Sequence, residues 1–220
     1  MLKALIFDFD GLILDTETPD VIAWQSIYAQ YDFTFPMESW GQIIGGTAAS
    51  KFDAALHLQG LLGRPLDLAG LQAQQTHISH SLVHQQPLMT GVIDLIHDAK
   101  QHGLKLAIAS SSPHSWVDAH AKRLGIFHYF DKVICADDVG PGRTKPNPDL
   151  FLTALNQLEV RKDEAVVFED SPNGVKAANR AGVFVVAIPN QVTSLLSLEG
   201  ANLIVKSLNA ISVQELDKLL

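Results

Sequence analysis

Short apolar runs alternate with longer helix-like stretches along most of the chain. The apolar runs predict a strand that begins at residue 5 and further strands near 104–110, 132–137, 164–170, 183–188 and, more weakly, 202–206. The helix-like stretches, three of which stop at a glycine suited to a C-terminal cap, cover residues 92–103, 115–125, 148–159 and 173–182. This alternation indicates an α/β fold with a doubly wound, mostly parallel sheet, a Rossmann-like core.

One region breaks the alternation. Residues 15–87 lack β-branched runs and are rich in Ala, Gln, Leu and His, which predicts a helical insertion between two parts of the core, residues 1–14 and 88–220. The insertion carries three histidines that would share one helix face: His77, His80 and His84. Because no carboxylate or cysteine accompanies them, we interpret this face as solvated and not as a metal site.

The charge and the cysteine content narrow the class of protein. The 220 residues include 24 acidic and 16 basic side chains, a formal net charge of −8. This balance disfavours nucleic acid or an anionic membrane as a partner. The single cysteine, Cys135, cannot form an internal disulfide, and Asp8 ends the N-terminal apolar run too early for a signal peptide. We therefore expect a cytoplasmic protein, either a monomer or a weak homodimer.

Two aspartates interrupt the first predicted strand. Asp8 and Asp10 lie two positions apart, and side chains alternate between the faces of a strand, so both carboxylates should point the same way. Like charges that close together normally destabilise a fold. A bound cation would resolve this conflict.

Other polar side chains lie where further strands are predicted to end or in the loops that follow. Ligands bind at this edge of an open parallel sheet. The side chains expected there are those of Ser110, Ser111, Ser112, Lys145, Glu169 and Asp170. Carboxylates, hydroxyls and one lysine together predict a site for a cation and a phosphate, and hard carboxylate oxygens with few other ligands favour Mg²⁺.

Four segments carry a resemblance to a known family. DFDGLILDTE, IASSSP, KPNPDLF and VFEDSPNG occur in the order and spacing of the four motifs of the haloacid dehalogenase-like hydrolases. The chain most resembles the subgroup that includes β-phosphoglucomutase and small sugar- and glycolate-phosphate phosphatases. The similarity in layout covers essentially the whole chain and implies that residues 15–87 form a cap domain that closes over the site.

The resemblance also implies a role for each motif residue. Asp8 would be the nucleophile that takes the phosphoryl group as an aspartyl-phosphate, and Asp10 would be the general acid and later the base. Ser110 and the backbone amide of Ser111 would bind phosphoryl oxygens, while Lys145 would neutralise the phosphate and the nucleophile. The implied Mg²⁺ ligands are the carboxylate of Asp8, the backbone carbonyl of Asp10, Asp170 and, directly or as an outer-shell partner, Glu169.

Residues beside the motifs have plainer interpretations. Ser112 and Ser171 fit as N-caps of the helices that follow them. Asn173 fits either a role in fixing the acidic loop or a turn, and Arg143 fits a solvated loop.

The insertion departs from the mutase pattern of the resembled subgroup. Mutases place a histidine shortly after the first motif and an arginine after a glycine-containing loop, where this chain has Asp20 and Ala49. Without a fixed cation there, a bisphosphate would be poorly held, which favours a phosphatase, although Lys51 could substitute. Gly46 and Thr47 are candidate substrate-binding positions, and a plain interhelical turn explains them about equally well.

The sequence therefore predicts a Mg²⁺-dependent phosphatase of a small phosphorylated metabolite, either a sugar phosphate or a glycolate-type phosphate. A sugar phosphomutase on the same scaffold is the first alternative. A non-catalytic binding protein that kept the fold is the second, and the intact set of implied catalytic residues argues against it: Asp8, Asp10, Lys145 and Asp170.

Overall fold

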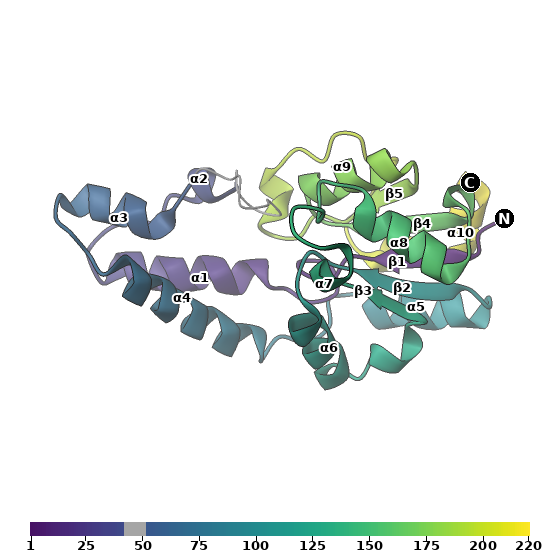
Figure 1. Cartoon of the computed structure of the whole chain (residues 1–220), viewed down its shortest axis with the longest axis horizontal. Helices are drawn as coiled ribbons and strands as arrows, with labels where there is room; N and C mark the ends of the chain where they lie inside the picture. Colours follow the sequence, from purple (N-terminus) through teal and green to yellow (C-terminus); the bar gives the residue numbers. More distant parts are fainter. Residues whose placement is uncertain (42–51) are drawn as a thin grey trace.

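The centre of the molecule is a parallel sheet. The structure is a computed structural model that describes residues 1–41 and 52–220. Within these residues, six strands pair, all in parallel, in the order β3-β2-β1-β4-β5-β6 (Figure 1). The strands are β1 (Ala4–Phe7), β2 (Lys105–Ala109), β3 (Lys132–Ile134), β4 (Ala165–Glu169), β5 (Phe184–Ala187) and β6 (Leu203–Ile204).

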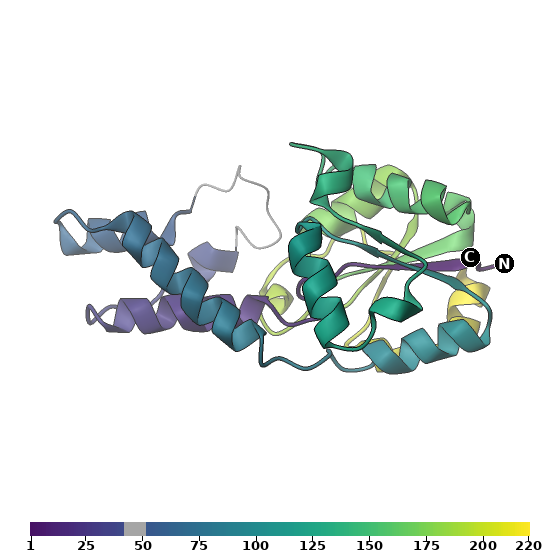
Figure 2. The same cartoon turned by 60° about the horizontal axis from the view of Figure 1, so that its bottom comes forward.

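Helices cover both faces of this sheet (Figure 2). They are α5 (Val92–Gln101), α6 (His114–Arg123), α7 (Ala136–Val139), α8 (Asp149–Leu158), α9 (Pro172–Ala181) and α10 (Val213–Leu219), with 3-10 turns η1 (Phe127–Tyr129), η2 (Lys162–Glu164), η3 (Thr193–Leu195) and η4 (Leu208–Ala210). Alternate residues of β1 divide between the two layers, since Leu5 and Phe7 pack with α5, α6 and α10, whereas Ala4 and Ile6 pack with α8 and α9. The predicted doubly wound fold is confirmed.

The chain leaves the sheet earlier than the sequence predicted. β1 ends at Phe7, so Asp8 and Asp10 follow the strand and do not lie within it. The Asp8 amide still donates a hydrogen bond of 3.0 Å to the Phe168 carbonyl of β4. The chain then turns through Gly11, whose φ of +79° lies in the left-handed region that favours glycine. The apolar run continues past the strand because Phe9 and the residues after it are buried in a turn.

In the part of the chain that the structure describes, four helices form a separate lobe beyond the carboxyl ends of the strands (Figure 1). The helical lobe consists of α1 (Glu17–Ala29), α2 (Met37–Gly41), α3 (Ala54–Leu62) and α4 (Leu68–Val83). It has a buried cluster of its own, which includes Trp24, Ile27, Tyr28, Phe35, Leu58 and Leu71. His77 and His80 of α4 and His84 at its C-cap are exposed, as the interpretation of a solvated face predicted. Among the described residues, no helix is long and apolar enough to cross a membrane.

Candidate active site

A buried lysine joins two carboxylates at the end of β1. The Lys145 ammonium, in the loop between α7 and α8, lies 2.5 Å from Oδ1 of Asp8 and 2.6 Å from Oε1 of Glu169. Although burial lowers its pKa, the charges of Asp8 and Glu169 raise the pKa of Lys145 above its ordinary value. The lysine is therefore a fixed positive charge against the Asp8 carboxylate.

The end of β4 holds Glu169 in one orientation. Its Oε2 accepts hydrogen bonds from the backbone amides of Asp170 and Ser171 at 3.1 and 3.2 Å, and from the Ser171 hydroxyl at 3.1 Å. A Cβ atom at Gly174 would lie 1.8 Å from the Glu169 carboxyl carbon, so only glycine leaves room for this carboxylate. Ser171 also accepts a hydrogen bond from the Gly174 amide at the start of α9, so its prediction as an N-cap is confirmed.

Asp170 is held by a residue that the sequence analysis did not single out. Nδ2 of Asn190, in the loop after β5, donates to Oδ2 of Asp170 at 2.7 Å and to the Gly11 carbonyl at 3.1 Å. Oδ1 of Asn190 accepts from the amides of Val192 and Thr193, both at 2.9 Å. The signal available in the sequence was the position of Asn190 after the fifth predicted strand, at the edge of the sheet where the other site residues lie.

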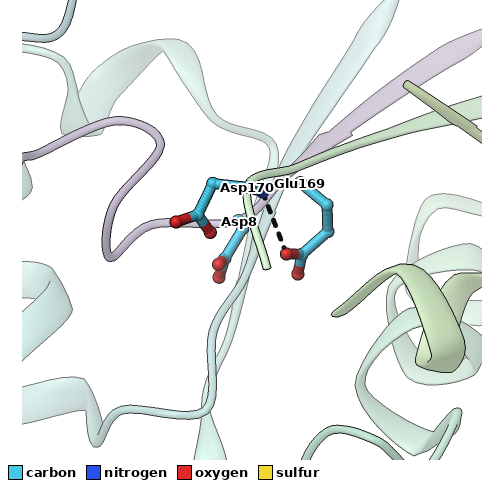
Figure 3. A group of neighbouring side chains, drawn as sticks. All are labelled: Asp8, Glu169 and Asp170. Carbon is cyan, nitrogen blue, oxygen red and sulfur yellow. Dashed lines mark hydrogen bonds between the residues drawn. The ribbon is translucent and has the colours of Figure 1, made fainter. Parts of the chain in front are cut away.

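Three carboxylates approach one another closely enough to share a cation (Figure 3). One oxygen from each of Asp8, Glu169 and Asp170 lies within 4.8 Å of the other two. Burial, reinforced by the charge of Glu169 and partly offset by Lys145, raises the pKa of Asp8 to about 8. Burial and the charges of Glu169 and Asp8 raise the pKa of Asp170 well above its ordinary value. We call Asp8, Lys145, Glu169 and Asp170 the buried acidic centre.

The donor set of this centre fits Mg²⁺. All the candidate side-chain ligands are carboxylate oxygens, which a hard divalent cation prefers. Glu169 already faces Lys145 and its own loop, so Asp8 and Asp170 are the carboxylates best placed to hold the ion. A cation would offset the excess negative charge that the single lysine leaves.

The second aspartate of the first motif turns toward α6. Oδ2 of Asp10 accepts hydrogen bonds from the hydroxyls of Ser110 at 3.2 Å and Ser112 at 2.7 Å, and Oδ1 accepts from Nε1 of Trp116 at 2.8 Å. The prediction that Ser112 caps α6 is wrong, because Pro113 occupies the cap position and the Ser112 hydroxyl binds Asp10. Trp116 was missed, since nothing in its sequence context connects it with the first motif.

The other candidate residues differ in how they relate to the site. Ser110 is buried at the end of β2 and its Oγ accepts a 3.0 Å hydrogen bond from the Ser112 amide, whereas Ser111 is exposed beside it. The exposed Arg143 pairs with Asp149, which agrees with a solvated loop position. Asn173 lies in the first turn of α9. Four positions discussed for the insertion lie outside the described residues: Gly46, Thr47, Ala49 and Lys51.

A cavity of about 570 Å³ lies between the helical lobe and the core. We call it the lobe-side cavity. Asp10, Ser112 and Trp116 line it on the core side, and α1 and α4 supply the lobe side, which includes Glu17, Asp20, Ser79 and His80. The Asp20 carboxylate accepts hydrogen bonds from the Ser79 hydroxyl and, at 3.0 Å, from the Gln75 amide. Asp10 therefore lies between the buried acidic centre and a space large enough for a small ligand.

Comparisons with known proteins agree with this geometry. Residues 5–188 match the family model described as haloacid dehalogenase-like hydrolase. YhcW of Bacillus subtilis (strain 168) is 40% identical over 199 residues, which cover 90% of this chain and 89% of YhcW. Fructose-1-phosphate phosphatase YqaB of Escherichia coli (strain K12) is 30% identical over 84% of this chain and 95% of that protein.

A solved structure extends the agreement to the fold. The crystal structure of β-phosphoglucomutase from Clostridium difficile covers 100% of this chain and 97% of that protein, with a TM-score of 0.74 and 23% sequence identity. At this identity the match concerns the fold alone. The family match over most of the chain, together with the site geometry, identifies the chain as a member of the haloacid dehalogenase-like hydrolase family, in the subgroup that includes β-phosphoglucomutase.

Proposed function

We propose that this hydrolase is a Mg²⁺-dependent phosphatase that acts on a small phosphorylated metabolite through an aspartyl-phosphate on Asp8. The observation that carries the proposal is the position of the Asp8 carboxylate, paired with the buried Lys145 and adjoining the carboxylates of Glu169 and Asp170. A carboxylate so placed can attack phosphorus, while the lysine and a divalent cation counter the charge of the phosphoryl oxygens.

In the first half of the reaction, an Asp8 oxygen forms a bond to phosphorus as the bond to the leaving oxygen breaks. Asp10 gives its proton to that oxygen, so the alcohol leaves uncharged. In the second half, Asp10 takes a proton from water, whose oxygen attacks phosphorus and releases the Asp8 carboxylate and inorganic phosphate. The place of Asp10 on the wall of the lobe-side cavity supports this role, because the leaving group must lie on that side of the phosphate.

The other motif residues would hold the phosphoryl group and the cation. Ser110 and the Ser111 amide would bind phosphoryl oxygens. Mg²⁺, when bound, supplies positive charge that orients the phosphate and stabilises the transition state. We assign its protein ligands to the carboxylates of Asp8 and Asp170 and the backbone carbonyl of Asp10, with Glu169 acting mainly to hold Lys145.

We further propose that residues 15–87 act as a cap domain and that the enzyme is a phosphatase and not a mutase. Asp20 lines the lobe-side cavity where the mutase pattern has a histidine, and a fixed acidic group there would repel a second phosphate. The cap would exclude water from all but the productive path to the phosphoryl group.

The test is phosphate release from a panel of phosphorylated metabolites and one aryl phosphate in the presence of Mg²⁺. We expect release from at least one sugar phosphate, loss of activity in EDTA and recovery with added Mg²⁺. Ca²⁺ should inhibit, because the larger ion takes more ligands at longer distances and would draw the Asp8 carboxylate away from in-line attack. Full activity in EDTA would contradict the metal assignment.

The same assay separates the two alternatives. A mutase given a hexose 1-phosphate would form the 6-phosphate isomer faster than inorganic phosphate, which phosphorus NMR of the reaction mixture distinguishes. A non-catalytic protein would release no phosphate from any member of the panel, the aryl phosphate included.

A further inference from the structure

The lobe-side cavity carries information about the substrate beyond its phosphate. Asp10, the proposed proton donor to the leaving oxygen, forms part of its wall, so the rest of the leaving group would extend into this space. Its volume of about 570 Å³ falls within the range of about 300–1,000 Å³ that is typical of small-molecule sites. The chemistry of the wall therefore selects the alcohol that the enzyme releases.

The wall is acidic. Asp10, Glu17 and Asp20 line the cavity, and among the lining residues that the structure describes there is no lysine or arginine. Asp20 is fixed in place by the Ser79 hydroxyl and the Gln75 amide, both of which reach the same carboxylate oxygen. Burial raises the pKa of Asp20 above its ordinary value, and the two donated hydrogen bonds partly offset this and favour the charged carboxylate.

The negative charge of this wall acts on its own members. Burial, followed by the charges of Asp20 and Asp10, raises the pKa of Glu17 to about 8, so Glu17 is mostly uncharged at neutral pH and Asp20 is the charged group on the lobe side of the cavity. The same charges act on any anion that enters, and the repulsion is stronger in a half-buried space than in water.

The wall also suits hydroxyl groups. A carboxylate has acceptors and no donors, so it pairs with groups that donate, and the hydroxyls of a sugar or polyol do this. Ser115 adds a hydroxyl that both donates and accepts, Ser112 adds an acceptor because its proton is donated to Asp10, and Trp116 adds apolar surface beside them.

We infer that the leaving group is an uncharged, hydroxyl-rich alcohol, and that Asp20 discriminates against leaving groups that carry a carboxylate or a second phosphate. This inference rests on the proposed function. It narrows the expected substrates to the monophosphates of sugars and polyols and predicts that glycolate-type phosphates and bisphosphates are poor substrates. Discrimination of this kind comes from a repulsive element as much as from attractive contacts.

Pairs of related substrates whose leaving groups differ in charge provide the test. The pairs are glucose 6-phosphate with 6-phosphogluconate, glycerol 3-phosphate with 3-phosphoglycerate, and fructose 1-phosphate with fructose 1,6-bisphosphate. In the presence of Mg²⁺ we expect kcat/KM for the substrate with the uncharged leaving group to exceed that for its partner with the anionic leaving group by about tenfold or more. 4-Nitrophenyl phosphate, assayed alongside, reports the core chemistry independently of the leaving-group preference.

The variant Asp20→Asn keeps the shape of the side chain and removes its charge. We expect Asp20→Asn to reduce the preference for the substrate with the uncharged leaving group by about threefold or more. Glu17→Gln should reduce this preference less. The control is Asp67→Asn, which removes one negative charge from an exposed side chain of the same lobe and retains a residue suited to cap α4. This control should leave the preference unchanged.

The possible failures are distinguishable. Turnover of 4-nitrophenyl phosphate without a preference for substrates with uncharged leaving groups would overturn the inference but would not contradict the proposed function. An unchanged preference in folded Asp20→Asn, checked by circular dichroism, would overturn the role of Asp20. No phosphate release from any substrate, the aryl phosphate included, would overturn the proposed function and this inference with it.

Discussion

The buried acidic centre and the lobe-side cavity meet at the end of β1 but are built in different ways. The side chains of the centre come from the ends of β1 and β4 and from the loop between α7 and α8, and each of its four residues is at most 6% exposed. The cavity combines the core with α1 and α4, and its acidic residues are only partly buried. Charge is thus fixed rigidly where the phosphate would react. The groups that would meet the leaving alcohol lie on α1, α4 and α6 and in the loops that follow β1 and β2, and substitutions on the helices can change selectivity without disturbing the centre.

The most severe expected effect comes from the nucleophile of the buried acidic centre. Asp8→Asn keeps an oxygen that can face Lys145 but loses the nucleophile and one proposed metal ligand, so kcat/KM should fall by about 10,000-fold or more. Phosphate release measures the loss, and a thermal unfolding curve checks that the variant folds. Near-normal release from the folded variant would rule out the mechanism.

A second variant tests whether Lys145 balances the charge of the centre. Lys145→Met leaves the buried carboxylates of Asp8 and Glu169 without their counter-charge, which should lower the free energy of unfolding by about 3 kcal/mol and also remove most activity. Urea denaturation without added metal measures the change in stability.

The chain offers a matched control for this variant. Lys3 pairs with Glu164 at 2.7 Å, but its side chain is 55% exposed. Lys3→Met should therefore change the unfolding free energy little, because water screens an exposed pair. Equal losses from the two variants would mean that burial of the centre does not matter.

A third variant addresses the boundary between the two regions. Asp10→Asn removes the proposed proton donor, and the rate with alkyl phosphates should fall by about 100-fold or more. Aryl phosphates have leaving groups that need little protonation, so their hydrolysis should fall much less. The ratio of the two rates separates loss of the proton donor from general damage, and equal losses would contradict the assignment.

The sequence predicted the fold and the composition of the buried acidic centre for a physical reason. Apolar runs mark the strands, and in a parallel sheet their carboxyl ends meet at one edge, so residues at the run ends are brought together. Asp8, Glu169 and Asp170 follow this rule. Lys145 lies in the loop after the third predicted strand and was expected at the same edge for that reason, whereas its role was implied by the resemblance. The roles assigned to these residues stay predictions until they are tested.

The contacts around Asp10 and Asp170 could not be predicted in the same way. Whether a serine caps a helix or binds a neighbouring carboxylate depends on a side-chain rotation, and Ser112 does the second where the first was expected. Trp116 reaches Asp10 across a sequence separation of 106 residues, and Asn190 reaches Asp170 from the loop after the next strand, where sequence position alone does not show which side chains pair. Short helices such as α7, whose four residues hold no full apolar period, were also not predicted.

The smallest expected effect concerns Trp116, which links the cavity to the proton donor. Its indole Nε1 donates to Oδ1 of Asp10 at 2.8 Å, and its ring contacts His80 of the helical lobe, with centroids 4.8 Å apart, and His120 of α6, at 4.3 Å. Trp116→Phe keeps an aromatic ring between the two histidines but removes the N–H group. Asp10 would then lose one of the donors that orient its carboxyl group.

A hydrogen bond to a charged group contributes about 1.5–3 kcal/mol, so we expect kcat for alkyl phosphates to fall by about tenfold in Trp116→Phe. Hydrolysis of 4-nitrophenyl phosphate should change little, because that reaction depends least on the proton from Asp10. Trp24→Phe is the control, since Trp24 is buried within the cluster of the helical lobe and its loss should leave the ratio of the two rates unchanged. If Trp116→Phe lowers both rates equally, the tryptophan acts only by filling space in the cavity wall; if it lowers the alkyl rate alone, a residue of the cavity orients the proton donor beside the buried acidic centre.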